Sequence, residues 1–106
     1  HVPFGKGATA LIGENEVAKL KKGVILINTA RGGVYDETAL LNGLNSGIIK
    51  GIGIDVFVNE PVTEAQKELL NHPNVCATPH IGGSTVEGQL RVSTEMADRL
   101  IAALGK

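Results

Sequence analysis

Three short runs of aliphatic residues constrain the fold of this chain more than any other feature. They occupy residues 24–27, 52–56 and 75–77, and continuous aliphatic runs of this kind are typical of parallel strands that are covered on both faces. Helical patterns precede, separate and follow the three runs. This alternation favours right-handed crossover connections and predicts an α/β fold built on a parallel sheet.

Local signals indicate where the first two helices begin and end. Residues 14–22 form a short, polar-rich helical pattern, and Gly23 is expected to stop it. Asp36 is a good N-cap for a second helix over residues 37–45, because its carboxylate can accept a hydrogen bond from a free amide of the first turn. Gly47 suits the left-handed position that closes many helices. The second helix is expected to bury Ala39, Leu40 and Leu44.

Two capping pairs predict the later helices. Thr63 and Gln66 are three residues apart and are expected to open a short third helix. Ser84 and Glu87 form a second pair of this kind, which would open the longest helix, over residues 85–104. An apolar stripe runs along that helix and consists of Leu90, Ala97, Leu100, Ile101 and Leu104.

The composition argues against two classes of partner. Lys and Arg number 10 against 11 Asp and Glu, so the formal net charge is −1 and no basic surface is available for nucleic acid. Apolar runs are far shorter than the ~20 residues of a membrane-spanning helix, so no membrane partner is expected. Hydrophobic residues make up 42% of the chain, which is enough for one packed domain. The single cysteine, Cys76, fits a reducing compartment, and we expect a cytoplasmic protein.

Charged side chains follow each of the three predicted strands. Arg31 comes after the first strand, Asp55 and Glu60 come at and after the end of the second, and His80 follows the third. Because ligands of parallel α/β sheets bind outside the carboxyl ends of the strands, these four side chains are expected to converge on one edge.

Each of the four has an ordinary structural explanation when it is considered alone. Arg31 could lie in a surface turn, Asp55 could cap nearby backbone amides, and Glu60 could be a solvated loop residue. A lone histidine such as His80 is also more often structural than catalytic. Their expected convergence is therefore more informative than any one of them.

Together the four residues predict a particular chemistry. A glutamate–histidine pair is a common device for proton transfer, because the carboxylate selects the imidazole tautomer and stabilises the protonated ring. An adjacent arginine offers a planar fork of donors that matches a carboxylate. This set suits the reversible reduction of a 2-keto acid. No side chain can donate a hydride, so a nicotinamide cofactor is expected.

Other chemistries fit the sequence less well. Cys76 lies in the middle of a predicted strand and is expected to be a small buried hydrophobe. The three histidines, His1, His72 and His80, lack metal-ligand spacing, so no metal site is expected. The chain contains neither a G-x-S-x-G nucleophile elbow nor a Walker A loop.

Three strings in this order resemble one family. The chain contains LINTARGGVYDETALL, GIGIDVFVNEP and TPHIGGSTVEGQ, and its N-terminus HVPFGKGATALIGENEVAKLKKG fits the pattern H-x-P-x5-T-x-L-I. These motifs are similar to the second half of the nucleotide-binding domain of D-isomer-specific 2-hydroxyacid dehydrogenases. The resemblance covers essentially the whole chain.

This resemblance implies a role for each charged residue. By the N-x-A-R-G motif, Arg31 would bind the substrate carboxylate and keto oxygen. By D-V-F-x-x-E-P, Glu60 would orient the histidine, and Asp55 would lie near the nicotinamide carboxamide. By P-H-I-G-G, His80 would be the general acid and base. NAD is the implied cofactor, and its nicotinamide half would contact Thr29, Ala30, Arg31, Asp55, His80, Ile81, Gly82 and Gly83.

The resemblance also implies an architecture. The fold class would be α/β, a partial Rossmann-type (doubly wound) parallel sheet of about three strands with flanking helices. No G-x-G-x-x-G pyrophosphate loop occurs in residues 1–106, so we expect the C-terminal half of a nucleotide-binding domain, with the glycine-rich half and the substrate domain outside the chain. The parent protein would be a homodimer or homotetramer that acts on a small anionic substrate.

Two other interpretations stay open on the sequence. Relatives with the same half-fold bind a nucleotide and act as transcriptional corepressors or scaffolds, for which partner contact matters more than turnover. Alternatively, the chain could be an inactive truncated remnant. The complete Arg–Glu–His set favours the dehydrogenase interpretation over both.

Overall fold

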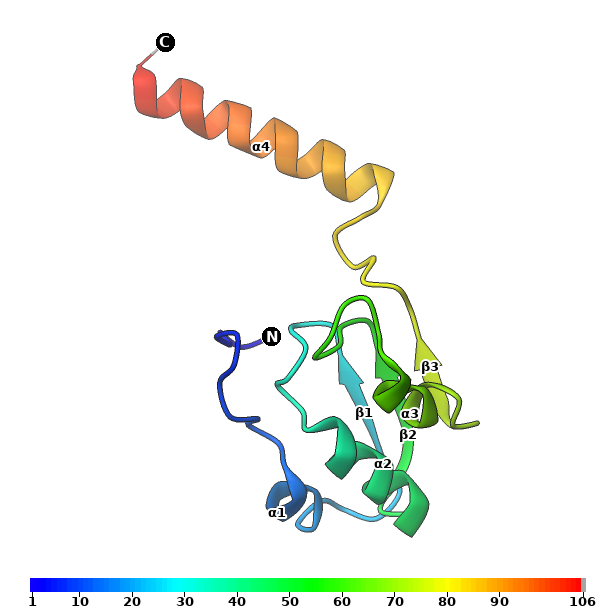
Figure 1. Ribbon diagram of the computed structural model, residues 1–106. Helices are drawn as coiled ribbons and strands as arrows, with labels where there is room; N and C mark the ends of the chain where they lie inside the picture. The colour runs from blue at the N-terminus through cyan, green and yellow to red at the C-terminus, as the bar shows by residue number, and fades with distance from the viewer. Residues whose placement is uncertain (106) are drawn as a thin grey trace.

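A computed structural model describes residues 1–105 of the chain and contains three strands, four α-helices and one short 3-10 helix (Figure 1). Most of these elements lie close to the positions that the sequence patterns predict. In chain order they are α1 (Glu14–Val17), β1 (Val24–Asn28), α2 (Glu37–Ser46), β2 (Ile49–Ile54), the 3-10 helix η1 (Glu64–Gln66), α3 (Lys67–Leu70), β3 (Val75–Ala77) and α4 (Val86–Leu104).

The sheet confirms the predicted parallel topology. Its strand order is β1-β2-β3, and both neighbouring pairs are parallel. The register shifts once, because Val24 pairs with Ile49 while the next residue, Ile25, pairs with Gly51. This irregularity allows Ile49 to face the same side of the sheet as the later isoleucines of β2. The three buried isoleucines of that strand are Ile49, Ile52 and Ile54.

The hydrophobic core lies on one face of the sheet, under α1, α2 and α3. Asp36 caps α2 as predicted, accepting a hydrogen bond from the Ala39 amide at 2.8 Å, and Gly47 closes the helix with a φ of 80°. Helix α2 packs so closely on β2 that a Cβ on Gly43 would lie 2.5 Å from the Ile49 side chain. The apolar residues at the centre of this core are Val17, Ala39, Leu40, Leu44, Ile49, Ile52, Ile54, Phe57 and Leu69.

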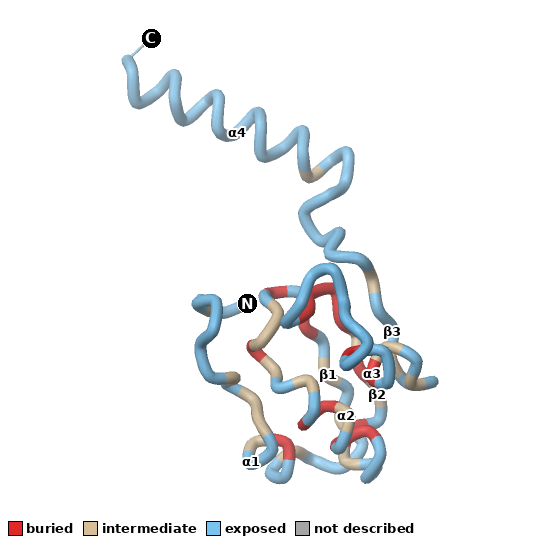
Figure 2. Tube along the Cα trace, viewed as in Figure 1, coloured by how far each residue is buried: buried red, intermediate tan, exposed pale blue. Residues whose placement is uncertain are grey.

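The opposite face of the sheet is bare, which corrects the expectation that the strands are covered on both faces. Ile25 and Ile27 of β1 point to this side and are 62% and 68% exposed. Cys76, expected to be buried, is also exposed. Among residues 1–105 no helix lies over this face (Figure 2). The aliphatic runs therefore predicted the strands correctly, but the part of the chain that the structure describes covers only one of their faces.

Helix α4 extends away from the rest of the molecule and gives it a longest dimension of 59 Å (Figures 1 and 2). It begins one residue later than predicted, because the Thr85 hydroxyl rather than that of Ser84 caps it by accepting the Gly88 amide at 2.9 Å. None of its residues is buried. Its apolar stripe is therefore exposed, including Leu90, Leu100, Ile101 and Leu104.

Two of the shorter helices differ from the predicted pattern. The helix expected over residues 14–22 ends at Val17, because the next amides, of Lys19 and Leu20, bond three residues back rather than four. The helix opened by the Thr63–Gln66 pair begins with the 3-10 turn η1 before α3. No helix within residues 1–105 has the length and apolar character needed to span a bilayer.

Candidate functional site

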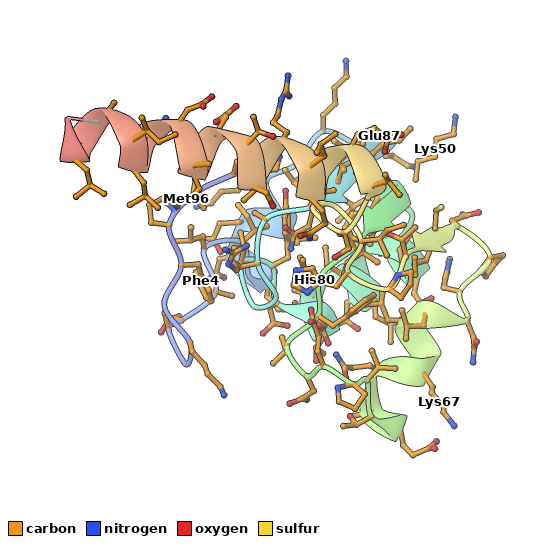
Figure 3. All side chains as sticks on the ribbon, turned by 90° about the horizontal axis from the view of Figure 1, so that it is seen from above. Phe4, Lys50, Lys67, His80, Glu87 and Met96 are labelled. Atoms are coloured by element: carbon orange, nitrogen blue, oxygen red, sulfur yellow. The ribbon has the colours of Figure 1, made fainter. Side chains whose placement is uncertain are left out.

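Three loops leave the carboxyl ends of the strands and carry the predicted site residues. We call them the Arg31 loop (residues 29–35), the Glu60 loop (residues 55–63) and the His80 loop (residues 78–85). Seen from above, His80 lies between the N-terminal segment that carries Phe4 and the lobe that carries Lys67 (Figure 3). The three loops share the edge of the sheet that the sequence predicted.

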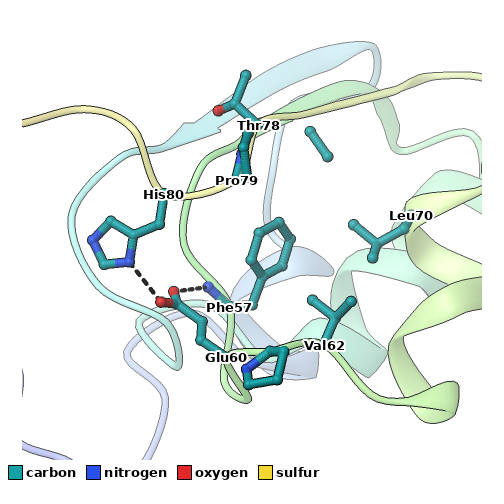
Figure 4. Close-up of a pocket in the computed structure, with 9 residues that line it drawn as sticks. Phe57, Glu60, Val62, Leu70, Thr78, Pro79 and His80 are labelled. Atoms are coloured by element: carbon teal, nitrogen blue, oxygen red, sulfur yellow. Dashed lines mark hydrogen bonds and ion pairs between the residues drawn. The ribbon is translucent and has the colours of Figure 1, made fainter. Parts of the chain in front are cut away.

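His80 and Glu60 are in direct contact across two loops. The ring Nδ1 of His80 lies 2.6 Å from Oε2 of Glu60, and the other carboxylate oxygen accepts the Phe57 amide at 3.1 Å (Figure 4). A carboxylate can only accept, so Nδ1 donates and the neutral ring keeps Nε2 as its acceptor. Within residues 1–105, Nε2 has no hydrogen-bond partner. The hydrogen bond from His80, followed by that from the Phe57 amide, lowers the pKa of Glu60 below its ordinary value.

Asp55 holds the His80 loop in place. Its Oδ1 accepts the Thr78 hydroxyl at 2.6 Å and the Ile81 amide at 2.9 Å, and its Oδ2 accepts the Gly82 amide at 2.9 Å. These bonds, led by that from Thr78, lower the pKa of Asp55, which is only 5% exposed. The bonded residues lie on both sides of His80 along the chain. The φ of His80 is 54°, a left-handed conformation that costs roughly 1–2 kcal/mol for a residue with a Cβ. The capping role left open by the sequence is thus present.

A side chain without a predicted role organises the Arg31 loop. Asn28, at the end of β1, is 5% exposed; its amide group donates to the Arg31 carbonyl and its oxygen accepts the Ala30 amide, both at 3.1 Å. Arg31 itself is exposed and donates from Nη1 to the Ala30 carbonyl at 2.7 Å. Within residues 1–105 its guanidinium forms no ion pair, so most of its donors are free to bind an anion. The sequence signal that could have identified Asn28 is its position as the one polar residue at the end of an aliphatic strand.

Gly32 brings the Arg31 loop against the Glu60 loop. A Cβ at this position would lie 1.8 Å from the Phe57 carbonyl oxygen and 2.1 Å from its carbon, distances that no side chain can occupy. The backbone of one loop therefore rests directly on the backbone of the other. Arg31 forms no ion pair with Glu60 or hydrogen bond with His80, but its loop is fixed beside theirs.

The N-terminal segment adds a residue that the sequence did not assign to the site. Nε2 of His1 lies 3.1 Å from the Thr29 hydroxyl. Two adjoining hollows, of about 430 and 340 Å³, open here, and Arg31 lines the smaller one. The residues common to both hollows are His1, Val2, Thr29 and Ala30.

The residues present fit one half of a dinucleotide. The hollows combine apolar walls with the Thr29 hydroxyl and an imidazole, which is the mixture a flat heteroaromatic ring with a polar substituent needs. On the other side of the edge, Gly82 and Gly83 are exposed, and a Cβ on Gly83 would meet open space. The chain has no G-x-G-x-x-G loop to bind a pyrophosphate.

A third cavity lies behind the His80–Glu60 pair (Figure 4). It has a volume of about 420 Å³ and lies between the Glu60 loop, α3 and β3. Its walls are mainly apolar, formed by Phe57, Pro61, Val62, Leu70, Ala77 and Pro79. Within residues 1–105, no cluster of His, Cys, Asp or Glu could hold a metal ion.

Comparison with known proteins identifies the domain type. Residues 1–82 match the family model described as D-isomer specific 2-hydroxyacid dehydrogenase, NAD binding domain. The chain is 46% identical over 106 residues to a hydroxypyruvate reductase of Thermotoga maritima, covering 99% of this chain and 35% of that protein. It is 45% identical over 101 residues to a D-3-phosphoglycerate dehydrogenase of Bacillus subtilis, covering 95% of this chain and 19% of that protein.

Solved structures show the same fold. A glyoxylate reductase from Paecilomyes thermophila matches 99% of this chain and 31% of its own with a TM-score of 0.83 and 40% identity. A D-lactate dehydrogenase from Aquifex aeolicus, complexed with NAD and lactic acid, matches 99% of this chain and 36% of its own with a TM-score of 0.78 and 33% identity. The chain spans about a third or less of the length of these proteins.

Proposed function

The chain belongs to the D-isomer specific 2-hydroxyacid dehydrogenases, where it matches the NAD-binding domain, and we propose that it carries the proton-transfer pair and the anion-binding arginine of the reaction. The reaction is the NAD-dependent, reversible oxidation of a D-2-hydroxy acid to the 2-keto acid. The single observation that supports this proposal most is the 2.6 Å contact between His80 and Glu60, which leaves the histidine Nε2 without a partner among residues 1–105.

The proposed roles follow from the positions of the protons. In oxidation, Nε2 of His80 accepts the hydroxyl proton of the substrate, and in reduction the protonated ring returns it to the keto oxygen. Glu60 keeps Nδ1 protonated and stabilises the imidazolium that forms. The free donors of Arg31 bind the substrate carboxylate in the two-pronged manner that a guanidinium allows.

Cofactor contacts are proposed for both sides of the sheet edge. Bound NAD would supply the hydride acceptor in the oxidation direction. Thr29, Ala30 and Arg31 would hold its nicotinamide half from one loop. Asp55 would act mainly by fixing the opposite loop, because its oxygens already accept three hydrogen bonds. The contacts proposed from that opposite loop come from His80, Ile81, Gly82 and Gly83.

The proposed substrate is 3-phosphoglycerate, which would place the enzyme in serine biosynthesis. Several relatives at 41–45% identity are D-3-phosphoglycerate dehydrogenases, which supports this choice. The hydroxypyruvate reductase of Thermotoga maritima is 46% identical, so a smaller hydroxy acid is the competing candidate. We further propose that these 106 residues are the C-terminal half of the nucleotide-binding domain of a cytoplasmic homodimer or homotetramer.

The proton-transfer role is tested in the enzyme that contains this chain. His80→Gln is expected to lower kcat by about 10²- to 10⁴-fold, the usual contribution of a general acid–base group. His72→Gln is the matched control, because His72 lies beyond α3 and its Nδ1 accepts the Asn74 amide. Wild-type turnover by His80→Gln would disprove the assignment. Comparing kcat/KM for 3-phosphoglycerate, glycerate and D-lactate then tests the substrate.

A second test uses the 106-residue chain alone. Calorimetric titration with NAD is expected to give a Kd of ~1 mM or weaker. The reason is that the chain offers no glycine-rich loop at a helix N-terminus to bind the pyrophosphate. Micromolar binding would contradict the half-site that we propose. Backbone amide shifts in the Arg31 and His80 loops would locate any weak binding.

A further inference from the structure

Phe57 anchors the start of the Glu60 loop in the core, but residues 58–63, which carry Glu60, have few apolar contacts. Val58 and Val62 are 55% and 41% exposed, and the residues between them are exposed as well. Glu60 must nevertheless keep its carboxylate within hydrogen-bond distance of His80. Polar contacts at the ends of the loop therefore have to restrict its movement.

Glu37, in the first turn of α2, provides those contacts. Its Oε1 accepts the Val58 amide at 2.8 Å, which ties down the chain two residues before Glu60. Both oxygens accept the side-chain amide of Gln66, at 3.2 and 2.9 Å. Gln66 is 4% exposed, so this amide has no access to bulk water as an alternative partner.

Gln66 extends the connection to the far end of the loop. Its side-chain oxygen accepts the Thr63 amide at 2.9 Å, while its nitrogen donates to Glu37. One carboxylate thus holds the Glu60 loop at Val58 directly and at Thr63 through one intermediate. Helix α2 does not need Glu37 as its N-cap, because Asp36 already accepts the Ala39 amide.

We propose that Glu37 is a positioning residue that keeps Glu60 in hydrogen-bond contact with His80. Its relevance to turnover rests on the proposed function, but the contact itself is a property of this chain. Glu37 acts through the backbone of the Glu60 loop and touches neither member of the pair.

Hydrogen-bond polarity allows a rescue design. In Glu37→Gln, with the remaining oxygen on the Val58 amide, the new nitrogen faces the Gln66 nitrogen across the 2.9 Å contact. Two donors cannot bond there, so only the longer 3.2 Å contact to Gln66 is left. Adding Gln66→Glu reverses both partners, so that residue 37 donates to residue 66, residue 66 still accepts the Thr63 amide, and the oxygen of residue 37 still accepts the Val58 amide. The double variant keeps the same total charge as the wild type.

The test is nuclear magnetic resonance on the 106-residue chain, which reads the contact without turnover. In the wild type the proton on Nδ1 of His80 is expected to give a downfield signal, and the Glu60 carboxyl is expected to titrate below 4.5. Glu37→Ala should abolish that signal and return the pKa of Glu60 toward 4.5. Glu37→Gln, which keeps the Val58 contact, should weaken the signal and move the pKa in the same direction, and the reversed double variant should restore both. Glu64→Ala, at an exposed acid on η1, is the control that should change neither.

The outcomes separate positioning from general stability. If Glu37→Gln lowers the thermal midpoint but leaves the Nδ1 signal and the Glu60 titration unchanged, the proposal is overturned. It is overturned as well if the double variant regains stability without regaining the signal. Should Glu37→Ala fail to fold, Glu37→Gln and the double variant decide. These readouts do not depend on turnover, so failure of the proposed function would not by itself change them.

Discussion

The body of the molecule (residues 1–85) and helix α4 both carry helical apolar patterns, but only the body buries them. In the body, α2 buries Ala39, Leu40, Gly43 and Leu44 against the sheet. Along the 19 residues of α4 the apolar residues recur at helical spacing, yet none is buried. A periodic pattern thus establishes that a helix has an apolar face, whereas only tertiary contact makes that face contribute to stability.

The largest expected effect comes from making the same substitution in both regions. Leu40 is 1% exposed and Leu100 is 54% exposed. Leu40→Ala leaves a cavity in the core and is expected to lower the free energy of unfolding by about 2–5 kcal/mol. Leu100→Ala should change it by less than ~0.5 kcal/mol. Urea unfolding followed by circular dichroism measures both, and equal losses would mean that α4 is packed in solution.

A smaller loss is expected where two loops of the body meet. Gly32→Ala places a Cβ on the Phe57 carbonyl, and the loops must separate to accept it. We expect a cost of about 1–3 kcal/mol, as for other overpacked sites. Gly5→Ala is the matched control, because a Cβ there meets nothing within 4 Å. If Gly32→Ala had the same unfolding free energy as Gly5→Ala, the two loops would not be in contact.

Low pH is expected to decrease the free energy of unfolding of the body. The pKa values of Asp55 and Glu60 are lowered in the folded state, so ionisation stabilises the fold above their ordinary values of 3.8 and 4.5. That contribution is lost as the pH falls from about 5 through the folded pKa values. Urea unfolding at pH 7 and pH 3 should show this slope, and Asp55→Asn should flatten it. Asp98→Asn, on α4, removes a carboxylate without a hydrogen bond within residues 1–105 and should leave the slope intact.

The smallest effects are expected for ion pairs, and here the two regions should agree. Glu64 pairs with Lys67 in the body, and Glu95 pairs with Arg91 on α4; all four side chains are at least 58% exposed. Glu64→Gln and Glu95→Gln should each change the unfolding free energy by about 0–0.5 kcal/mol. A clear difference between them would mean that the region, and not exposure, determines the strength of a pair.

Much of the fold could be predicted because its signals are local. Aliphatic runs and caps such as Asp36 and Gly47 depend on a few neighbouring residues, and parallel topology follows from their alternation. The convergence of Glu60 and His80 followed from topology, since both come after carboxyl strand ends. Exposure of Cys76 and of the α4 stripe could not be predicted, because apolar character says nothing about which elements are present to cover it.

The finer parts of the site depend on side-chain reach. The sequence did not decide whether Asp55 caps a loop or binds a ligand, because both roles require an aspartate at the same strand end. Glu37 and Asn28 received no role because their partners are turns whose course the sequence leaves undetermined. Arg31 was placed at the correct edge, but the direction of a long, flexible side chain is set by its surroundings.

Strands β2 and β3 are neighbours in one ladder, and Ile54 pairs with Ala77 just before the loops that carry Glu60 and His80 diverge. Main-chain pairing keeps such strands ~4.8 Å apart whatever side chains they carry. Backbone pairing thus fixes the separation of the two strand ends from which the loops of Glu60 and His80 begin. Replacing one aliphatic side chain by another in these strands should leave that separation unchanged. The proton-transfer pair can therefore be retained while the side chains of the sheet change.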